Sequence, residues 1–162
     1  SPHVASVLRF DGKTAILRTS SGTVGLDLAR KAGADPILAA GFVNSRETAR
    51  YLKKLGVGGG SLIPMGWKGE KPSIEDDQCA EYIQAMYDGR AVDHAAILKR
   101  LDGHEDLARF QAPEEIEFLS QDLNICFDFD RYDFALKAEM VTRASSGVLL
   151  PSPLMELVPV RV

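Results

Sequence analysis

The chain of 162 residues lacks an excess of basic residues, a long apolar run and a rich supply of cysteine or histidine. Its net charge is −4, so no basic field would attract a phosphate backbone, which argues against non-specific nucleic-acid binding. No apolar run approaches the roughly 18 residues of a membrane span, and no signal peptide is visible. We therefore expect no nucleic-acid partner and no membrane.

The two cysteines, Cys79 and Cys126, lie far apart, and each falls in an apolar pattern. This placement is typical of structural thiols and suits a reducing cytoplasm, which we expect as the location. The histidines His3, His94 and His104 have no metal-ligand spacing. We expect them at the surface or flanking helices.

The residues that are present favour a globular α/β protein. Hydrophobic residues make up 45% and charged residues 26%, and the length fits one domain with a sizeable core. Predicted strands at 14–19, 36–40 and 61–65 alternate with predicted helices that end at Gly33, Gly56 and about Asp88. This alternation predicts a three-layer α/β/α fold with a largely parallel sheet.

The second half of the chain has a different pattern. Short helices are predicted at 92–101 and 105–110, and a further helix from Pro113 to about Ile125. Strands at 134–142 and 147–150 are predicted to flank a polar turn at 143–146, and 157–162 is either one more strand or a tail. We expect one domain over residues 1–162, with βα units in 1–90 and a smaller helix-and-hairpin part in 91–162.

A hydroxyl-rich segment follows the first predicted strand and opens a helix. It reads Thr19, Ser20, Ser21, Gly22 and Thr23. The first turn of a helix carries backbone N–H groups without intrahelical partners, and its dipole favours negative charge. The glycine permits close approach of a ligand, and the hydroxyls donate to phosphate oxygens. The segment predicts a phosphate site; an ordinary helix cap is the alternative, since Ser and Thr are preferred caps.

Carboxylates begin the third predicted helix. Helical spacing places Glu75 and Asp76 on stripes that face the protein body and Asp77 toward water. Two inward carboxylates beside a phosphate loop are hard oxygen ligands that suit Mg²⁺, so both residues are candidate metal ligands and catalytic residues. The alternative is a helix start stabilised by acids, with Ser73 and Asp76 as a variant capping box.

Three segments leave the carboxyl ends of the predicted strands: 19–23, 41–45 and 66–76. In a parallel sheet these ends share one rim, where ligands bind. Asn44, Ser45 and Gly66 therefore join the hydroxyl-rich segment as candidate substrate-binding residues. The acidic positions Asp128, Asp130 and Asp133 lack the glycine and glutamate of a calcium loop, and a polar turn is the better interpretation.

The order of these motifs resembles the 2-phosphosulfolactate phosphatase family. The segment 19–23 resembles the family's Thr-Thr-Asn-Gly-Thr region, and 41–45 its Gly-Ser-Phe-Leu-Asn-Ala segment. Residues 63–66 followed by 74–80 resemble its Ile-Pro-Ala-Gly and Leu-Glu-Asp pair, and 122–134 its closing segment. The resemblance implies a magnesium-dependent phosphatase with an α/β/α fold. Its substrate would be a phosphorylated, sulfonated or carboxylated hydroxy acid on the route to coenzyme M.

The chain also departs from this family. Nothing matches the family's Asp-Val-Leu-Arg-Ala unit; residues 6–9 look similar but lack the aspartate, so the chain is a fragment or lacks that unit. Trp67 and Ser21 stand where the family has a glutamate and an asparagine. Two alternatives to the enzyme therefore stay open. One is a non-catalytic anion-binding module, and the other is a homo-oligomer that pairs through the apolar tail residues Leu154, Leu157 and Val160.

Overall fold

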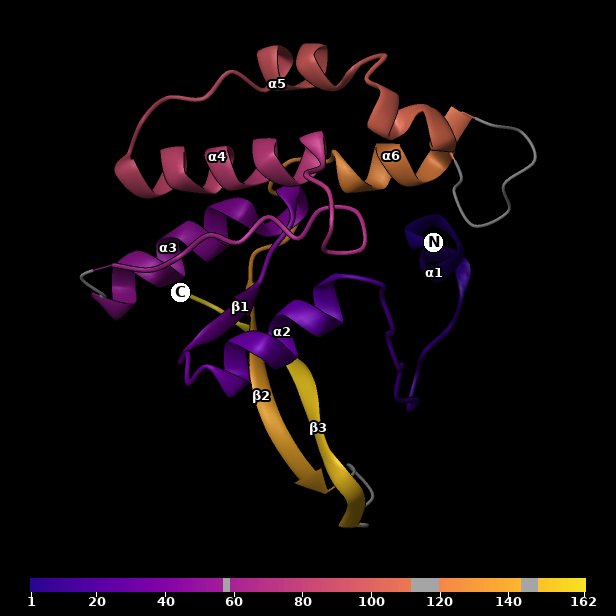
Figure 1. Ribbon diagram of the computed structural model, residues 1–162, viewed down its shortest axis with the longest axis vertical. Helices are drawn as coiled ribbons and strands as arrows, with labels where there is room; N and C mark the ends of the chain where they lie inside the picture. Colours follow the sequence, from indigo (N-terminus) through magenta and orange to yellow (C-terminus); the bar gives the residue numbers. More distant parts are fainter. Residues whose placement is uncertain (57–58, 112–119, 144–148) are drawn as a thin grey trace.

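The computed structural model describes residues 1–56, 59–111, 120–143 and 149–162 (Figure 1). Its α-helices are α1 (Pro2–Val7), α2 (Gly22–Lys31), α3 (Ser45–Leu55), α4 (Ile74–Asp88), α5 (His94–Leu101) and α6 (Ser120–Cys126). Two short 3₁₀ helices are η1 (Phe42–Asn44) and η2 (Glu105–Gln111), and the strands are β1 (Ile37–Ala39), β2 (Ala135–Arg143) and β3 (Leu149–Val160).

The strands form one antiparallel sheet in the order β1-β2-β3. Leu38 lies opposite Lys137 in the first pair, and Ala138 lies opposite Leu157 in the second. The β2–β3 hairpin extends away from the helices α3 to α6 (Figure 1). The prediction of a largely parallel, three-layer α/β/α sheet is therefore wrong: the described residues contain only this three-stranded antiparallel sheet.

The error comes from the choice of strand neighbours. The predicted strand at 36–40 forms as β1, but its neighbour is β2, from the opposite end of the sequence. The predicted strands at 14–19 and 61–65 have no strand assignment, although their composition favours one. A strand needs an adjacent strand for its N–H and C=O groups, and local composition does not supply that neighbour.

The prediction of strands near the C-terminal end is correct. The strand expected at 134–142 is β2, and the segment 157–160 is the last third of β3 rather than a free tail. Pairing with β2 leaves Leu157 and Val160 half-buried, whereas Leu154 is half exposed. Arg143, predicted as the first residue of the turn at 143–146, ends β2. The rest of that turn and the start of the strand predicted at 147–150 lie outside the described residues.

The helix predictions from the first half are confirmed. Helices α3 and α4 end at Gly56 and Gly89, whose φ angles of 61° and 74° are left-handed and favour glycine at these caps. The helix expected at 92–101 is α5, and the one at 105–110 is the 3₁₀ helix η2. Part of the helix predicted from Pro113 lies outside the described ranges, and α6 begins at Ser120.

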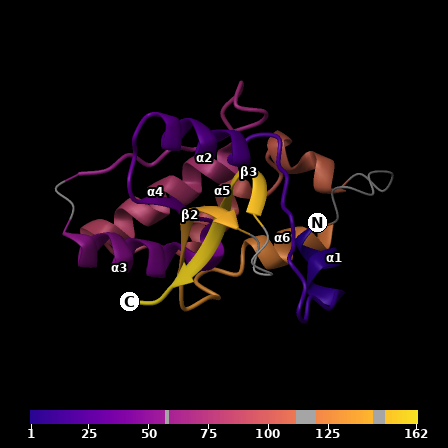
Figure 2. The ribbon, with the colours of Figure 1, turned by 90° about the horizontal axis from the view of Figure 1, so that it is seen from below.

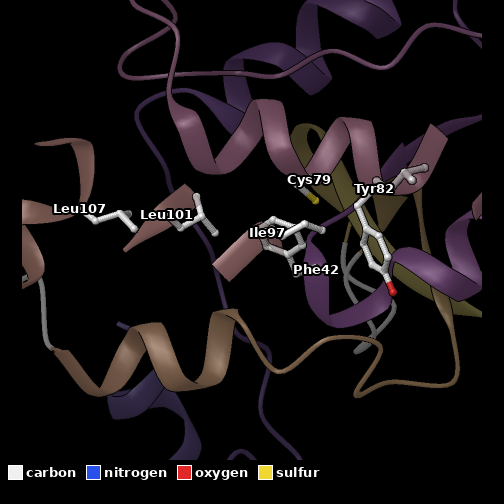
Figure 3. Close-up of a cluster of buried hydrophobic side chains, with 7 residues drawn as sticks. Phe42, Cys79, Tyr82, Ile97, Leu101 and Leu107 are labelled. Carbon is white, nitrogen blue, oxygen red and sulfur yellow. The ribbon is translucent and has the colours of Figure 1, made fainter. Parts of the chain in front are cut away.

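The core lies between η1, α4, α5, η2 and the segment that follows α6 (Figure 3). Its buried members are Phe42, Cys79, Tyr82, Ile83, Ile97, Leu101 and Leu107. The Phe42 ring packs edge-on against Phe127 and Phe129, with centroids 5.7 and 4.9 Å apart. This aromatic contact anchors η1, and with it the start of α3, against the segment that follows α6.

The N-terminal helix α1 lies beside α6 in both ribbon views (Figures 1 and 2). The buried carboxylate of Asp122 accepts hydrogen bonds from the Ser1 hydroxyl at 2.6 Å and from the His3 backbone N–H at 2.7 Å. These bonds tie the first residues of the chain to its second half. Within the described part, no helix combines the length and apolarity needed to cross a membrane.

Candidate functional site

Three distant segments meet at Gly66. The Ser21 hydroxyl donates to the Gly66 carbonyl at 3.0 Å, and the Gly66 N–H donates to Asp76 Oδ2 at 2.7 Å. These bonds bring the start of α2, the 61–66 segment and the start of α4 into one place, which we call the Gly66 junction (Ser21, Gly66 and Asp76). Two of the three segments predicted to share a rim therefore do meet, although no parallel sheet brings them there.

The hydroxyl-rich segment caps α2. Thr19 Oγ1 accepts from the Thr23 N–H, and the Thr23 hydroxyl donates to the Thr19 carbonyl, both at 3.0 Å. Ser21 is buried, whereas Ser20 is exposed and Gly22 is half-buried. The segment thus performs the capping role of the alternative interpretation, while Ser20 and the first turn of α2 still face outward. An anion at this end would meet the positive end of the dipole of a ten-residue helix.

Gly66 is required by its backbone geometry. Its φ angle is 62°, and a Cβ at this position would collide with the Lys71 carbonyl. That carbonyl accepts from the Trp67 N–H at 2.9 Å and closes the 67–71 turn. A glycine here therefore lets the turn fold back tightly onto the start of α4.

A hollow of about 320 Å³ lies beside this turn. It is lined by Trp67, Lys71, Pro72, Glu105 and Asp106. Asp106 Oδ2 accepts from the Ile74 N–H at 2.9 Å and so satisfies a first-turn amide of α4. The Ser73 side chain makes no cap bond, so the expected Ser73–Asp76 capping box does not form.

Glu75 and Asp76 are half-buried in the first turn of α4, with Glu75 Oε2 shielded from solvent. Asp77 is half-buried rather than solvated as expected. Among the residues that the structure describes, no three His, Cys, Asp or Glu side chains cluster closely enough to hold a metal ion. Mg²⁺ in phosphoryl-transfer sites commonly uses only one or two carboxylates together with substrate phosphate and water, and Glu75 and Asp76 are residues of that type.

Asn44 and Ser45 are buried and hydrogen-bonded to the backbone. Asn44 Oδ1 accepts from the Gly41 N–H at 2.9 Å, and the Ser45 hydroxyl donates to the Gly41 carbonyl at 2.9 Å. Ser45 Oγ also lies 3.8 Å from the sulfur of Cys79, one helical turn beyond Asp76. Both side chains therefore fix the η1–α3 entry behind the start of α4 and do not reach the Gly66 junction directly.

The two cysteines differ in environment. Burial raises the pKa of the Cys79 thiol to about 12, and the charges of Asp76 and Asp130 act in the same direction, although the Ser45 contact opposes them. Cys79 is therefore a neutral structural thiol, as expected. Cys126 is also a free thiol but is exposed. Burial therefore does not support the structural role that we predicted for Cys126.

Sequence reasoning missed a polar cluster built around the buried side chains of Tyr82 and Asp130, which the half-buried His94 and the exposed Arg46 complete. The Tyr82 hydroxyl donates to Asp130 Oδ2 at 2.5 Å and lies 2.9 Å from His94 Nε2. Asp130 also accepts from the Arg46 N–H at 2.8 Å and pairs with its guanidinium at 2.9 Å. Because the Tyr82 proton goes to Asp130, His94 Nε2 is the donor toward the Tyr82 oxygen.

Burial, followed by the bond to Asp130, raises the pKa of Tyr82. His94, the first residue of α5, stacks on Phe129 with the ring centroids 4.3 Å apart and is half-buried. The cluster joins α3, α4, α5 and the 128–134 turn. Its one local sequence signal was the run of aspartates that we interpreted as a polar turn; the positive φ of Asp130, 55°, agrees with a turn, but its side chain is buried.

Comparison with known proteins agrees with the motif order. A family model described as 2-phosphosulpholactate phosphatase matches residues 1–139 of the chain. No curated protein and no solved structure matches it. The match spans most of the 162 residues and contains every residue of the Gly66 junction. This chain belongs to the 2-phosphosulpholactate phosphatase family.

Proposed function

We propose that this protein hydrolyses the phosphate ester of a small sulfonated or carboxylated hydroxy acid, of the 2-phosphosulfolactate type, with Mg²⁺ as cofactor. The observation that supports it most is the Gly66 junction, which brings the hydroxyl-rich segment next to the carboxylates of α4. Family membership supports the reaction class. The two free thiols support a reducing, cytoplasmic location.

In this proposal the start of α2 receives the substrate phosphate. The exposed Ser20 hydroxyl and the Gly22 N–H in the first turn of α2 supply donors, whereas the Thr23 N–H is held by Thr19; the helix dipole adds favourable charge. Thr19 and Ser21 support the loop from behind through their bonds to Thr23 and Gly66. Asn44 and Ser45 act indirectly, because their bonds to the Gly41 backbone stabilise the start of α3.

Glu75 and Asp76 would hold the magnesium ion. When bound, Mg²⁺ polarises the phosphate ester and lowers the pKa of a coordinated water. Asp76 has a second role, because its bond to the Gly66 N–H ties the carboxylate pair to the phosphate segment. Carboxylate placement and loop placement are therefore coupled in this chain.

The test measures phosphate release from 2-phosphosulfolactate by the full chain, with and without Mg²⁺. We expect a rate that depends on Mg²⁺, a loss of about 100-fold in Asp76→Asn, and a higher Mg²⁺ requirement in Glu75→Gln. Asp77→Asn is the matched control on the same helical turn and keeps the activity. Absence of any Mg²⁺-dependent turnover by the folded protein contradicts the proposal.

A second candidate is a non-catalytic module that keeps the anion pocket, and Trp67 favours it. Its indole lines the hollow where the family has a carboxylate, and Lys68 Nζ lies 5.7 Å from the indole centroid. Isothermal titration with 2-phosphosulfolactate separates the two candidates. Binding without turnover supports the module, and the absence of both binding and turnover refutes the pocket itself.

A further inference from the structure

The hollow beside the Gly66 junction is attached to the proposed site on two sides. On one side, its lining residue Trp67 follows Gly66 directly in the chain. On the other side, its lining residue Asp106 accepts from the N–H of Ile74, the first residue of α4. The volume of about 320 Å³ is at the small end of ligand pockets, so the hollow suits a short alcohol part next to the phosphate.

The charged side chains of this hollow are unequal in number. Among the residues that the structure describes, Lys71 is the one base in the lining, and Glu105 and Asp106 are the two acids. Lys68 is nearby, but its Nζ lies 5.7 Å from the ring centroid of Trp67 and it does not line the hollow. Lys71 can neutralise one acid group of a ligand, whereas a second acid group would lie against carboxylates.

The indole of Trp67 gives the hollow an apolar wall. Trp67 is 37% exposed, so a ligand can reach it, and Pro72 lines the same hollow. Contact with this wall favours a methyl group, whereas a sulfonate would lose hydration there without gaining a hydrogen bond. Because Trp67 stands where the family has a glutamate, this wall belongs to the present chain and not to the family motif.

We propose that this hollow receives the alcohol part of the substrate and selects a hydroxy acid with one carboxylate and no sulfonate. The inference rests on the proposed hydrolysis and names one of its two substrate types. Lys71 pairs with the carboxylate, and Trp67 contacts the carbon chain. Glu105 and Asp106 exclude the sulfonate by repulsion between like charges.

Two phosphate esters that differ only in the sulfonate test this selection. 2-Phospholactate has a methyl group at the carbon that carries the sulfonate in 2-phosphosulfolactate. With the full chain and Mg²⁺, we expect kcat/KM to be at least about 10-fold higher for 2-phospholactate. Trp67→Ala is expected to lower that value by about 10-fold, and Lys71→Gln is expected to lower kcat/KM for both esters.

Glu105→Lys replaces an acid of the lining with a base. We expect it to reduce the ratio between the two kcat/KM values by at least about 10-fold, because the sulfonate gains a partner. Glu70→Lys is the matched control, since it makes the same charge change in the 67–71 turn outside the lining. Both residues are exposed, and circular dichroism checks that both variants fold. An equal change of the ratio in the two variants overturns the proposal.

Binding is measured separately from turnover. Trp67 is the single tryptophan of the chain, so its fluorescence reports on the hollow. We expect a dissociation constant at least about 10-fold lower for 2-phospholactate than for 2-phosphosulfolactate. Equal or tighter binding of 2-phosphosulfolactate overturns the selection and leaves the proposed hydrolysis standing. The expected preference without any turnover supports the selection and contradicts the hydrolysis, and no fluorescence response to either ester overturns the selection.

Discussion

The helical body, which comprises α3 to α6, and the N-terminal region, which comprises residues 7–28, differ in burial although both contain amphipathic helices. In α4, Tyr82 and Ile83 are 2% and 3% exposed, because α3, α5 and the segment after α6 cover them. In α2, Val24 and Leu28 are more than half exposed. The comparison teaches that an amphipathic pattern specifies a helix, whereas burial requires a second element to cover its apolar side.

Truncation of a core aromatic gives the largest expected difference between the two regions. Phe42→Ala removes a ring that packs against Phe127 and Phe129, and we expect the free energy of unfolding to fall by about 3–5 kcal/mol. Ile16→Ala in the N-terminal region is expected to change it by less than about 0.5 kcal/mol, because Ile16 is exposed. Urea unfolding, monitored by circular dichroism at low protein concentration, measures both; equal losses would contradict the comparison.

The polar cluster around Tyr82 and Asp130 gives the next largest effect. Asp130→Asn removes the charge that pairs with Arg46 and accepts from Tyr82, while the asparagine still tolerates the positive φ at this position. We expect a loss of about 1.5–3 kcal/mol, because the Tyr82 hydroxyl and the Arg46 backbone N–H lose a charged acceptor; the exposed Arg46 guanidinium adds little.

The matched control is Asp128→Asn, which removes only an exposed ion pair with Arg131. We expect a change below about 1 kcal/mol there. Thermal and urea unfolding of the two variants compare them directly. If Asp128→Asn costs as much as Asp130→Asn, then the polar cluster is not what stabilises the body.

The Gly66 junction lies between the two regions and gives an intermediate effect. Gly66→Ala forces a side chain into a left-handed backbone against the Lys71 carbonyl, so we expect a loss of about 1–3 kcal/mol and a reduced Mg²⁺-dependent rate. Gly69→Ala also has a positive φ, 71°, but no neighbouring atom meets the added Cβ. A rate that falls equally in both variants would mean that backbone strain, rather than the junction, explains the effect.

The two thiols give the smallest effect and report burial directly. Because burial holds Cys79 neutral, we expect Ellman's reagent to modify one thiol per folded chain at pH 8, namely Cys126, and two thiols in denaturant. The folded pKa of about 12 lies above the ordinary value of 9.0. The unfolded chain therefore loses this proton first.

That order of deprotonation sets the sign of the pH dependence. The contribution of Cys79 to stability is complete below pH 9.0 and declines as the pH rises toward about 12. Cys79→Ala is expected to flatten this decline in urea titrations at a series of pH values. Rapid modification of both thiols in the folded protein would contradict the burial of Cys79.

Local sequence patterns predicted the helices well and the sheet poorly. Glycine caps, first-turn acids and apolar spacing located α3 and α4, because these signals act within a few residues. The prediction of the sheet was wrong because β1 pairs with a strand about 100 residues later, and nothing in the sequence of β1 identifies that strand. The cluster around Asp130 was missed for the same reason, since its members come from four separate parts of the chain.

The sequence by itself determined the helix positions, the acidic character, the family and the types of residue available to a phosphate and metal site. Only the tertiary structure decided that Ser21 and Asp76 meet through Gly66, that Asn44 and Ser45 are buried in backbone contacts, and that Ile16 and Ile63 stay exposed. The physical reason is range: helix formation depends on neighbours within one or two turns, whereas burial and hydrogen bonding depend on which distant segments come to lie side by side.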